Sequence, residues 1–251
     1  MEHKNTFKPL LIFFIVAAIL APWCNVMAQK TASEFMEAGI KNYKEKKYAK
    51  AIEAFTKKIE LDSNNSKTDI YIYRGIVHDA MNNFGLAIAD FNMAQNIDSN
   101  DVFLYVERAK TFYNIRNHEA ACKDFLKVTV LNPNSKDAEE AWRFLGKINQ
   151  SIKDYKNAVN YYTRVLRFAP KDYEVIFKRG ECKFFLNDYK GAIKDFDLCI
   201  EISSEFQYAF ALRGEAKLKI EDKEGACKDL NRAYKLGVMD ILGLINENCK
   251  K

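Results

Sequence analysis

The sequence predicts an all-α protein, a right-handed α-solenoid of about six helix–turn–helix repeats closed by a C-terminal capping helix. Three observations lead to this prediction. Glycine (10) and proline (4) are scarce among the 251 residues, which disfavours a loop-rich β protein. An alanine that follows a short polar turn, and precedes an aromatic or large apolar residue by four positions, recurs about every 34 residues. A second small residue stands 12 positions before each of these alanines.

The recurring positions keep one register through the chain. The alanines are Ala51, Ala87, Ala121, Ala158, Ala192 and Ala226. The small residues before them are Gly39, Gly75, Ala109, Gly146, Gly180 and Gly214, and the large residues after them are Phe55, Phe91, Phe125, Tyr162, Phe196 and Leu230. Each repeat therefore offers two helices that approach closely at the small residue, while the large side chain fills the space beside the crossing. Because no helix pair buries its apolar face alone, neighbouring pairs must stack.

This period and pattern resemble the tetratricopeptide repeat, a helix–turn–helix unit. The fullest match is "AWRFLGKINQSIKDYKNAVNYYTRVLRFAP", in which Trp142, Leu145, Gly146, Tyr155, Ala158, Tyr162 and Pro170 stand at family positions. The resemblance predicts repeats at residues 32–65, 68–101, 102–135, 139–172, 173–206 and 207–236, followed by a capping helix within 237–251. In the cap, Val238, Ile241, Leu242, Ile245 and Cys249 are expected to share one apolar face.

Four repeats carry an arginine just before the small residue and an aspartate 16 positions after that arginine. The pairs are Arg74 with Asp90, Arg108 with Asp124, Arg179 with Asp195, and Arg213 with Asp229. The first and fourth repeats lack both residues, so the two occur together. In an antiparallel helix pair they lie level with each other. The pattern therefore predicts structural ion pairs that link the two helices of a repeat, and it argues against a repeated active site.

The first residues predict an export signal. Two lysines precede a twelve-residue apolar run, Leu10 to Ala21, and Val26 and Ala28 stand at the spacing that a signal peptidase reads. The run is short for a membrane-spanning helix, which needs about 20 residues. We therefore expect residues 1–28 to be a cleaved signal peptide and the protein to be periplasmic or secreted. The alternative is an uncleaved anchor, the only route by which the domain would contact a membrane.

No motif in the chain predicts catalysis. Histidine occurs only at His3, His78 and His118, and none has cysteines or carboxylates at metal-ligand spacing. There is no glycine-rich phosphate loop and no serine elbow motif, and the acidic residues do not converge. The net charge of +5 comes from 39 basic and 34 acidic residues that are interspersed, unlike the basic blocks of nucleic-acid-binding proteins. We expect no enzyme activity, no cofactor, no metal and no nucleic-acid partner.

The cysteines fall into two groups. Cys122, Cys182 and Cys199 are expected to be buried small apolar residues, and Cys182 and Cys199 stand too far apart along the helices to bridge. Cys227 begins the buried run of the last repeat's second helix, and Cys249 ends the apolar face of the cap. The two are a candidate disulfide, a pairing that a resemblance to other exported repeat proteins also favours. Two free thiols are the alternative.

The resemblance implies a binding module for a protein or peptide segment, which would dock on the concave surface formed by the first helices of the repeats. The candidate contact residues are Tyr43, Phe103, Lys110, Tyr113, Arg143, Lys147, Phe177, Glu181, Phe184 and Tyr208. Arg143 and Lys147 favour an acidic or C-terminal carboxylate group on the partner. The alternative is that the aromatic residues pack between repeats. The family's carboxylate clamp is absent, because Met36, Ile40, Ile72 and Ile76 occupy its positions.

Two functions are compatible with such a module. The first is an adaptor of the bacterial cell envelope that binds a protein or peptide through the concave surface. The second is an assembly subunit that is permanently packed within a larger envelope complex, which a broad apolar patch on the second helices would favour.

Overall fold

The computed structural model describes residues 33–61 and 67–249, and all regular structure within them is helical. The predicted signal peptide, residues 1–28, lies outside this range. The chain divides into two compact units, which we name the N-terminal segment (up to Asn117) and the C-terminal segment (from His118). The division falls inside the predicted third repeat, between its two helices.

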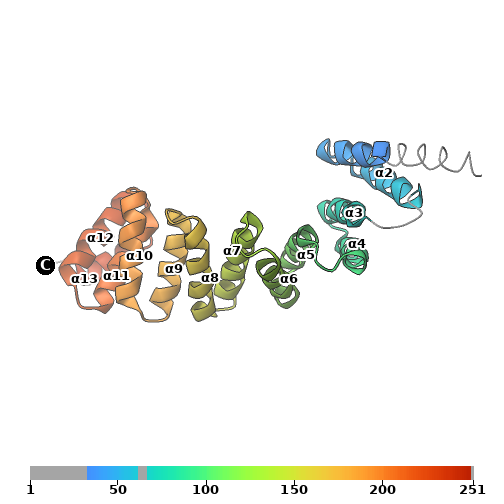
Figure 1. Cartoon of the computed structure of the whole chain (residues 1–251). Coiled ribbons are helices and arrows are strands. Elements are labelled where there is room, and N and C mark those ends of the chain that lie inside the picture. Colours follow the sequence, from blue (N-terminus) through green and yellow to red (C-terminus); the bar gives the residue numbers. More distant parts are fainter. Residues whose placement is uncertain (1–32, 62–66, 250–251) are drawn as a thin grey trace, which may run out of the picture. The chain divides into compact units, whose positions relative to one another are not determined.

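The N-terminal segment contains a helix over residues 33–44 followed by four more helices. These are α2 (Tyr48–Leu61), α3 (Thr68–Ala80), α4 (Phe84–Ile97) and α5 (Val102–Asn114). Helices α3 and α4 run antiparallel and form the most extensive contact of this segment (Figure 1). Helix α5 then packs against both α4 and α3, so that first helices of successive repeats lie next to each other.

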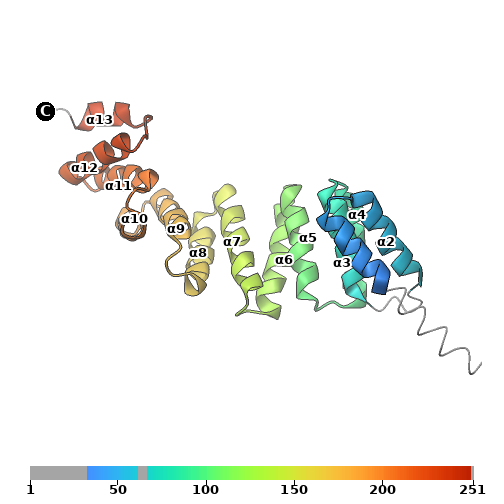
Figure 2. The ribbon, with the colours of Figure 1, turned by 90° about the horizontal axis from the view of Figure 1, so that it is seen from above.

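The C-terminal segment continues the same arrangement with eight helices. They are α6 (His118–Leu131), α7 (Lys136–Ser151), α8 (Tyr155–Phe168), α9 (Tyr173–Phe185), α10 (Tyr189–Ile202), α11 (Gln207–Lys219), α12 (Lys223–Lys235) and α13 (Leu242–Asn248). From α7 to α13, each helix packs against the one before it, and α9 also contacts α11 (Figure 2). The fold is thus a helical solenoid of repeats, as the 34-residue period predicts.

The helix crossings confirm the role predicted for the small residues. A Cβ atom added at Gly146 would lie 2.5 Å from the Tyr162 ring, and one added at Gly75 would lie 2.8 Å from the Phe91 ring. Both rings are almost completely buried. The two backbones can therefore approach only because the first helix carries no side chain at this point.

The turn between the two helices of each repeat has one conformation throughout. In every repeat a residue five positions before the repeat alanine adopts a positive φ, between 58° and 65°, and none of these residues is glycine. The residues are Lys46, Asn82, Arg116, Lys153, Asn187 and Glu221. An aspartate follows in several turns and caps the next helix, as Asp188 does by accepting a hydrogen bond from the Gly191 backbone N–H at 3.0 Å.

The end of the array is closed by α13, which is only seven residues long and contains no fully buried residue. Val238, Leu244, Ile245 and Cys249 pack against the cluster formed by Phe210, Leu230 and Ile241. Leu242, predicted to lie on the packed face, is 44% exposed. The prediction was wrong there because α13 begins only at Leu242, after a turn that follows Gly237, so one continuous helix does not relate Val238 to Leu242.

A disulfide joins Cys227 on α12 to Cys249 at the end of α13, with the two Cα atoms 5.4 Å apart. The sequence identified these two cysteines as a candidate disulfide. The bridge spans 22 positions of the chain, and closing a loop of this length stabilises a fold by roughly 3 kcal/mol. The bridge therefore fixes the end of α13 to α12, in addition to the packing of Leu244 and Ile245.

Candidate functional site

The arginine–aspartate pairs lie where the register places them. The Arg179 guanidinium donates to both carboxylate oxygens of Asp195, at 3.0 Å and 2.6 Å, and Arg213 binds Asp229 in the same way at 2.8 Å and 2.6 Å. Both aspartates are buried. Such a planar two-point contact fixes the orientation of both side chains, so each pair links the first helix of its repeat to the second.

A third partner that was not among the predicted site residues joins these pairs. Lys183 lies 2.7 Å from Asp195, and Lys217 lies 2.8 Å from Asp229. Each lysine stands 12 positions before its aspartate, a repeated spacing that the sequence displays. Two cations therefore share one buried carboxylate in each of these repeats, which is a structural arrangement and offers no reactive group.

In the α3–α4 pair a histidine takes the place of that lysine. Arg74 donates to Asp90 at 2.9 Å and 2.7 Å, and His78 Nε2 lies 3.9 Å from the same carboxylate. Burial lowers the pKa of His78; Asp90 opposes this effect, and Arg74 adds to it. Among the residues that the structure describes, the buried Nδ1 atom of His78 finds no hydrogen-bond partner.

The fourth predicted pair involves residues of two different segments. Arg108, in the N-terminal segment, donates to Asn92 Oδ1 at 2.7 Å and to Gln95 Oε1 at 2.6 Å on α4. Asp124 is buried on α6 in the C-terminal segment. The predicted pairing of these two residues remains a prediction.

The candidate binding surface is best described through its register. One and four positions after the small residue, the side chains of a first helix share one side, which we name the first-helix face. In the C-terminal segment this face consists of Lys147 and Gln150 on α7, Glu181 and Phe184 on α9, and Glu215 and Leu218 on α11. Gln150 Nε2 donates to Glu181 Oε2 at 2.7 Å, so the faces of α7 and α9 are in direct contact.

Arg143 does not offer the free positive charge expected of it. Its guanidinium contacts Glu139 at 2.6 Å and Asp172 at 2.6 Å. Two carboxylates therefore neutralise it and hold it between α7 and the start of α9. The expectation that Arg143 attracts a carboxylate of the partner is corrected by these two ion pairs.

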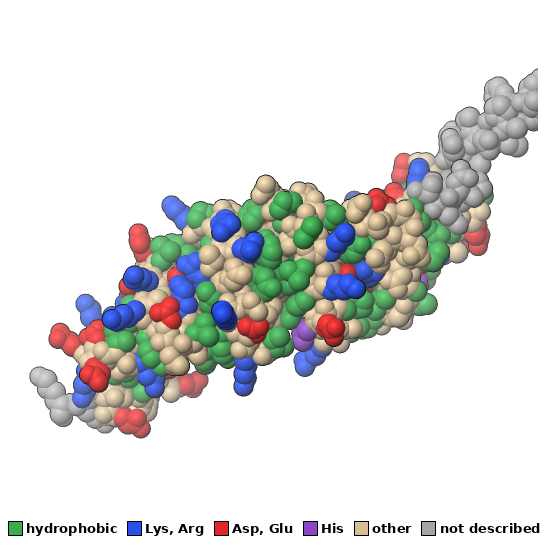
Figure 3. Space-filling view, turned by 60° about the horizontal axis from the view of Figure 1, so that its bottom comes forward, with side chains coloured by type: hydrophobic (Ala, Val, Ile, Leu, Met, Phe, Trp, Pro, Cys, Tyr) green, Lys and Arg blue, Asp and Glu red, His purple; other side chains and the backbone are tan. Residues whose placement is uncertain are grey.

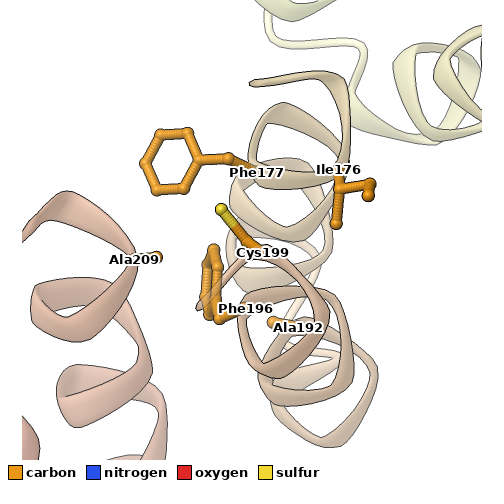
Figure 4. Close-up of a cluster of buried hydrophobic side chains, with 6 residues drawn as sticks. All are labelled: Ile176, Phe177, Ala192, Phe196, Cys199 and Ala209. Carbon is orange, nitrogen blue, oxygen red and sulfur yellow. The ribbon is translucent and has the colours of Figure 1, made fainter. Parts of the chain in front are cut away.

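Phe177 belongs to the core, and its predicted role as a binding anchor was wrong. The residue is 7% exposed, and its ring packs edge-on against Phe206 with the ring centroids 5.0 Å apart. Figure 4 shows the ring extending from α9 toward the side on which Ala209 of α11 lies, beside Phe196 and Cys199. The alternative stated for the aromatic residues, packing between repeats, holds for Phe177.

Other candidates of the C-terminal segment remain accessible. Tyr208 is 52% exposed, Lys147 is exposed with its ammonium 5.4 Å from the Phe144 ring centre, and Phe184 is partly buried. Phe185, next to Phe184, is 52% exposed and stacks on Tyr155. Figure 3 shows acidic and basic side chains interspersed with exposed hydrophobic ones on the face that it draws. These residues form a mixed surface with both charge and aromatic area.

The N-terminal segment holds the remaining candidates. Phe103 is 42% exposed, with its ring centre 5.9 Å from that of Tyr73, and Lys110 forms an ion pair with Glu107 at 3.1 Å. Tyr43 and Tyr113 are partly buried, and burial raises the pKa of Tyr43. Since the two segments are separate units, these four residues form their own part of the predicted surface.

Within the described residues, no group of three or more histidine, cysteine or carboxylate side chains is arranged to hold a metal ion.

The thiols of Cys122, Cys182 and Cys199 are free, with Cys122 only partly buried instead of buried as expected. Burial raises the pKa of the Cys182 thiol to about 12 and that of Cys199 to about 11. Both therefore stay protonated and unreactive near neutral pH.

Among residues 33–61 and 67–249, none of the helices has the length and apolar character needed to cross a bilayer.

Comparison with known sequences agrees with the repeats seen in the structure. Residues 139–172 and 173–206 match the profile of the tetratricopeptide repeat. Human DnaJ homolog subfamily C member 7 is 33% identical over 138 residues, which are 51% of this chain and 27% of that protein. Rat RNA polymerase II-associated protein 3 is 29% identical over 145 residues, 58% of this chain and 20% of that protein. The chain thus spans only 20–27% of the length of these relatives.

Solved structures show the same fold. YrrB, described as a TPR protein with an unusual peptide-binding site, superposes with a TM-score of 0.68 at 23% identity, covering 78% of this chain and 99% of that chain. MamA superposes with a TM-score of 0.62 at 21% identity, covering 73% and 96%. The helix pairs, their crossings and their turns define a helical repeat scaffold. Residues 139–206 therefore carry two tetratricopeptide repeats, and the solved structures show that the chain has the fold of a helical repeat protein.

Proposed function

We propose that this protein is a non-catalytic scaffold that binds a protein or peptide segment through the first-helix face. The tetratricopeptide fold is generally a non-catalytic scaffold for protein–protein interaction, and the named relatives carry the same repeats. The observation that supports the proposal best is the composition of the face itself. Lys147 is exposed and Phe184, Glu215 and Leu218 are partly buried, so the face offers a partner both charged and apolar side chains, whereas the positions that face the second helices are filled by the core.

Export to the bacterial cell envelope is part of the proposal. The apolar run and cleavage spacing within residues 1–28 favour it. The Cys227–Cys249 disulfide also favours it, because such bonds persist in oxidising compartments. Fractionation of producing cells, with mass spectrometry of the mature N-terminus, would test it. A cytosolic protein with an intact N-terminus would contradict it.

Photocrosslinking in producing cells tests the binding face. A crosslinking amino acid at Lys147 or Tyr208 is expected to capture a protein partner, whereas the same amino acid at the exposed Lys194 of α10 is expected to capture none. Phe184→Ala is expected to weaken capture by about 2 kcal/mol or more, provided that circular dichroism shows an unchanged helix content. Capture from Lys194 alone would overturn the assignment of the face.

One observation favours assembly into a complex as a second function. On α6, Leu126 and Val130 lie one turn apart and are 40% and 74% exposed. On α10, Leu198 and Ile202 repeat this spacing, and each is 37% exposed. Light scattering of the purified chain tests this alternative, because a stable oligomer that Val130→Lys disrupts would support it and a strict monomer would not.

A further inference from the structure

The carboxylates of Glu181 and Glu215 occupy equivalent places on α9 and α11, one position after the small residue of each repeat. Their surroundings differ. Glu181 receives a hydrogen bond from Gln150 at 2.7 Å and an ion pair from Lys178 at 2.9 Å. The Gln150 amide is itself oriented, because the Tyr162 hydroxyl donates to its Oε1 atom at 2.8 Å. A hydrogen bond and an ion pair thus both stabilise the Glu181 carboxylate.

One period later, every one of these polar partners is replaced by an apolar side chain. Phe184 takes the place of Gln150, Leu212 that of Lys178, and Phe196 that of Tyr162. Gln150 and Glu181 are 31 positions apart, and Phe184 and Glu215 have the same separation (215 − 184 = 31). Helices α9 and α11 are in contact, as this equivalence requires.

Glu215 consequently has no hydrogen bond and no ion pair within the described part of the chain, although it is partly buried. Burial raises the pKa of its carboxyl, and Lys219, one turn further along α11, lowers it without forming an ion pair. A carboxylate that is removed from water and lacks a partner is costly. A cation that arrives from outside would relieve this cost, and the apolar side chains around it would hold the aliphatic part of such a side chain.

We propose that Glu215 is the receptor for a lysine or arginine side chain of the bound segment, whose aliphatic stem packs on Phe184 and Leu212. This inference rests on the proposed function and specifies its ligand class. It reverses the expectation of an acidic partner, since Arg143 is neutralised by its own ion pairs. The aromatic ring adds to the preference, because the face of a phenyl ring attracts cations.

Binding of peptide pools to the purified full-length protein tests the proposal. The probes are fluorescein-labelled decapeptides with acetylated and amidated ends, in which one position is fixed as lysine, arginine, norleucine or glutamate and the others are drawn from neutral residues. Fluorescence anisotropy is expected to show about tenfold tighter binding of the lysine and arginine pools than of the norleucine pool. Because the chain carries a net charge of +5, unspecific attraction would favour the glutamate pool instead.

Three variants locate the effect. Glu215→Gln is expected to remove the preference for lysine and arginine. Glu174→Gln, which changes an exposed carboxylate of α9, serves as the matched control and is expected to keep it. Phe184→Gln rebuilds the Gln150–Glu181 arrangement, so it is expected to reduce the preference and to lower the pKa of Glu215, as measured by carboxyl ¹³C NMR.

The outcomes separate the two proposals. Equal binding of the lysine and norleucine pools, or a preference that survives Glu215→Gln, would overturn the role of Glu215 and leave the binding scaffold intact. If no pool binds, neither the ligand class nor the proposed function stands. A pKa of Glu215 that Phe184→Gln leaves unchanged would also count against the proposal, because it would show that the ring does not cover the carboxylate.

Discussion

Two glycines of the α3–α4 pair respond in opposite ways to the same change. A Cβ atom at Gly75 would lie 2.8 Å from Cε1 of Phe91 and 3.0 Å from its Cζ, closer than carbon atoms approach without displacement. The ring has no free space to move into, since it is completely buried. A Cβ atom at Gly85, in the first turn of α4, would meet nothing within 4 Å.

The expected magnitudes follow from two opposing terms. Alanine is better than glycine inside a helix by about 1 kcal/mol, because it loses less backbone freedom on folding. Extra volume in a packed core costs about 1–3 kcal/mol. Gly75→Ala is therefore expected to lower the free energy of unfolding by up to about 2 kcal/mol, whereas Gly85→Ala is expected to raise it by about 0.5–1 kcal/mol.

Urea unfolding followed by circular dichroism measures both variants in the same helix pair. The midpoint is expected to fall for Gly75→Ala and to rise for Gly85→Ala. In a Phe91→Leu background, Gly75→Ala is expected to cost less, because the smaller side chain leaves space for the added methyl group. If Gly75→Ala stabilises the protein as much as Gly85→Ala, close approach at the small residue is not what holds the pair together.

Three further predictions concern buried side chains. Phe177→Ala is expected to lower the free energy of unfolding by about 3–5 kcal/mol, because it leaves a cavity between repeats, and a loss below about 1 kcal/mol in urea unfolding would contradict its core position. Asp195→Ala leaves two partly buried cations without their shared carboxylate and is expected to cost about 3–5 kcal/mol, against less than about 1 kcal/mol for the exposed Asp197→Ala. Burial lowers the pKa of His78 in the folded state, so the unfolded chain binds the proton more readily and stability falls as the pH drops below about 6.5. Urea midpoints at pH 7.5 and 5.5 are expected to differ more for the native sequence than for His78→Gln, and equal differences would exclude this role of the histidine.

The helix crossings and ion pairs could be predicted because each depends on the register inside one repeat. The spacing of 16 positions places Arg179 beside Asp195 whatever the neighbouring repeats contain. The same reasoning identifies Lys183, which stands 12 positions before that aspartate in a spacing that recurs in the last repeat. The lysine that joins each of these arginine–aspartate pairs could therefore also have been predicted from the sequence period.

The candidate contact residues could be predicted only in part, because their exposure also depends on residues in the connections that lead from one repeat to the next. Phe177 is covered by Phe206, which lies in the connection to the next repeat, 29 positions further along the chain. Asp172, also 29 positions away, takes up the charge of Arg143. Such contacts depend on how one repeat is rotated against the next, and the period of 34 residues does not specify that rotation.

The left-handed residue of each turn has a consequence for how this protein can change. A non-glycine residue with positive φ costs roughly 1 kcal/mol, and asparagine tolerates it better than most. Asn82 and Asn187 already use this tolerance, whereas Lys46, Arg116, Lys153 and Glu221 do not. In each of these four turns, a single substitution to asparagine or glycine is therefore expected to raise the stability of the protein. Such a substitution changes the turn and none of the side chains of the first-helix face, so the stability gained would let that face diversify toward new ligands while the helices stay folded.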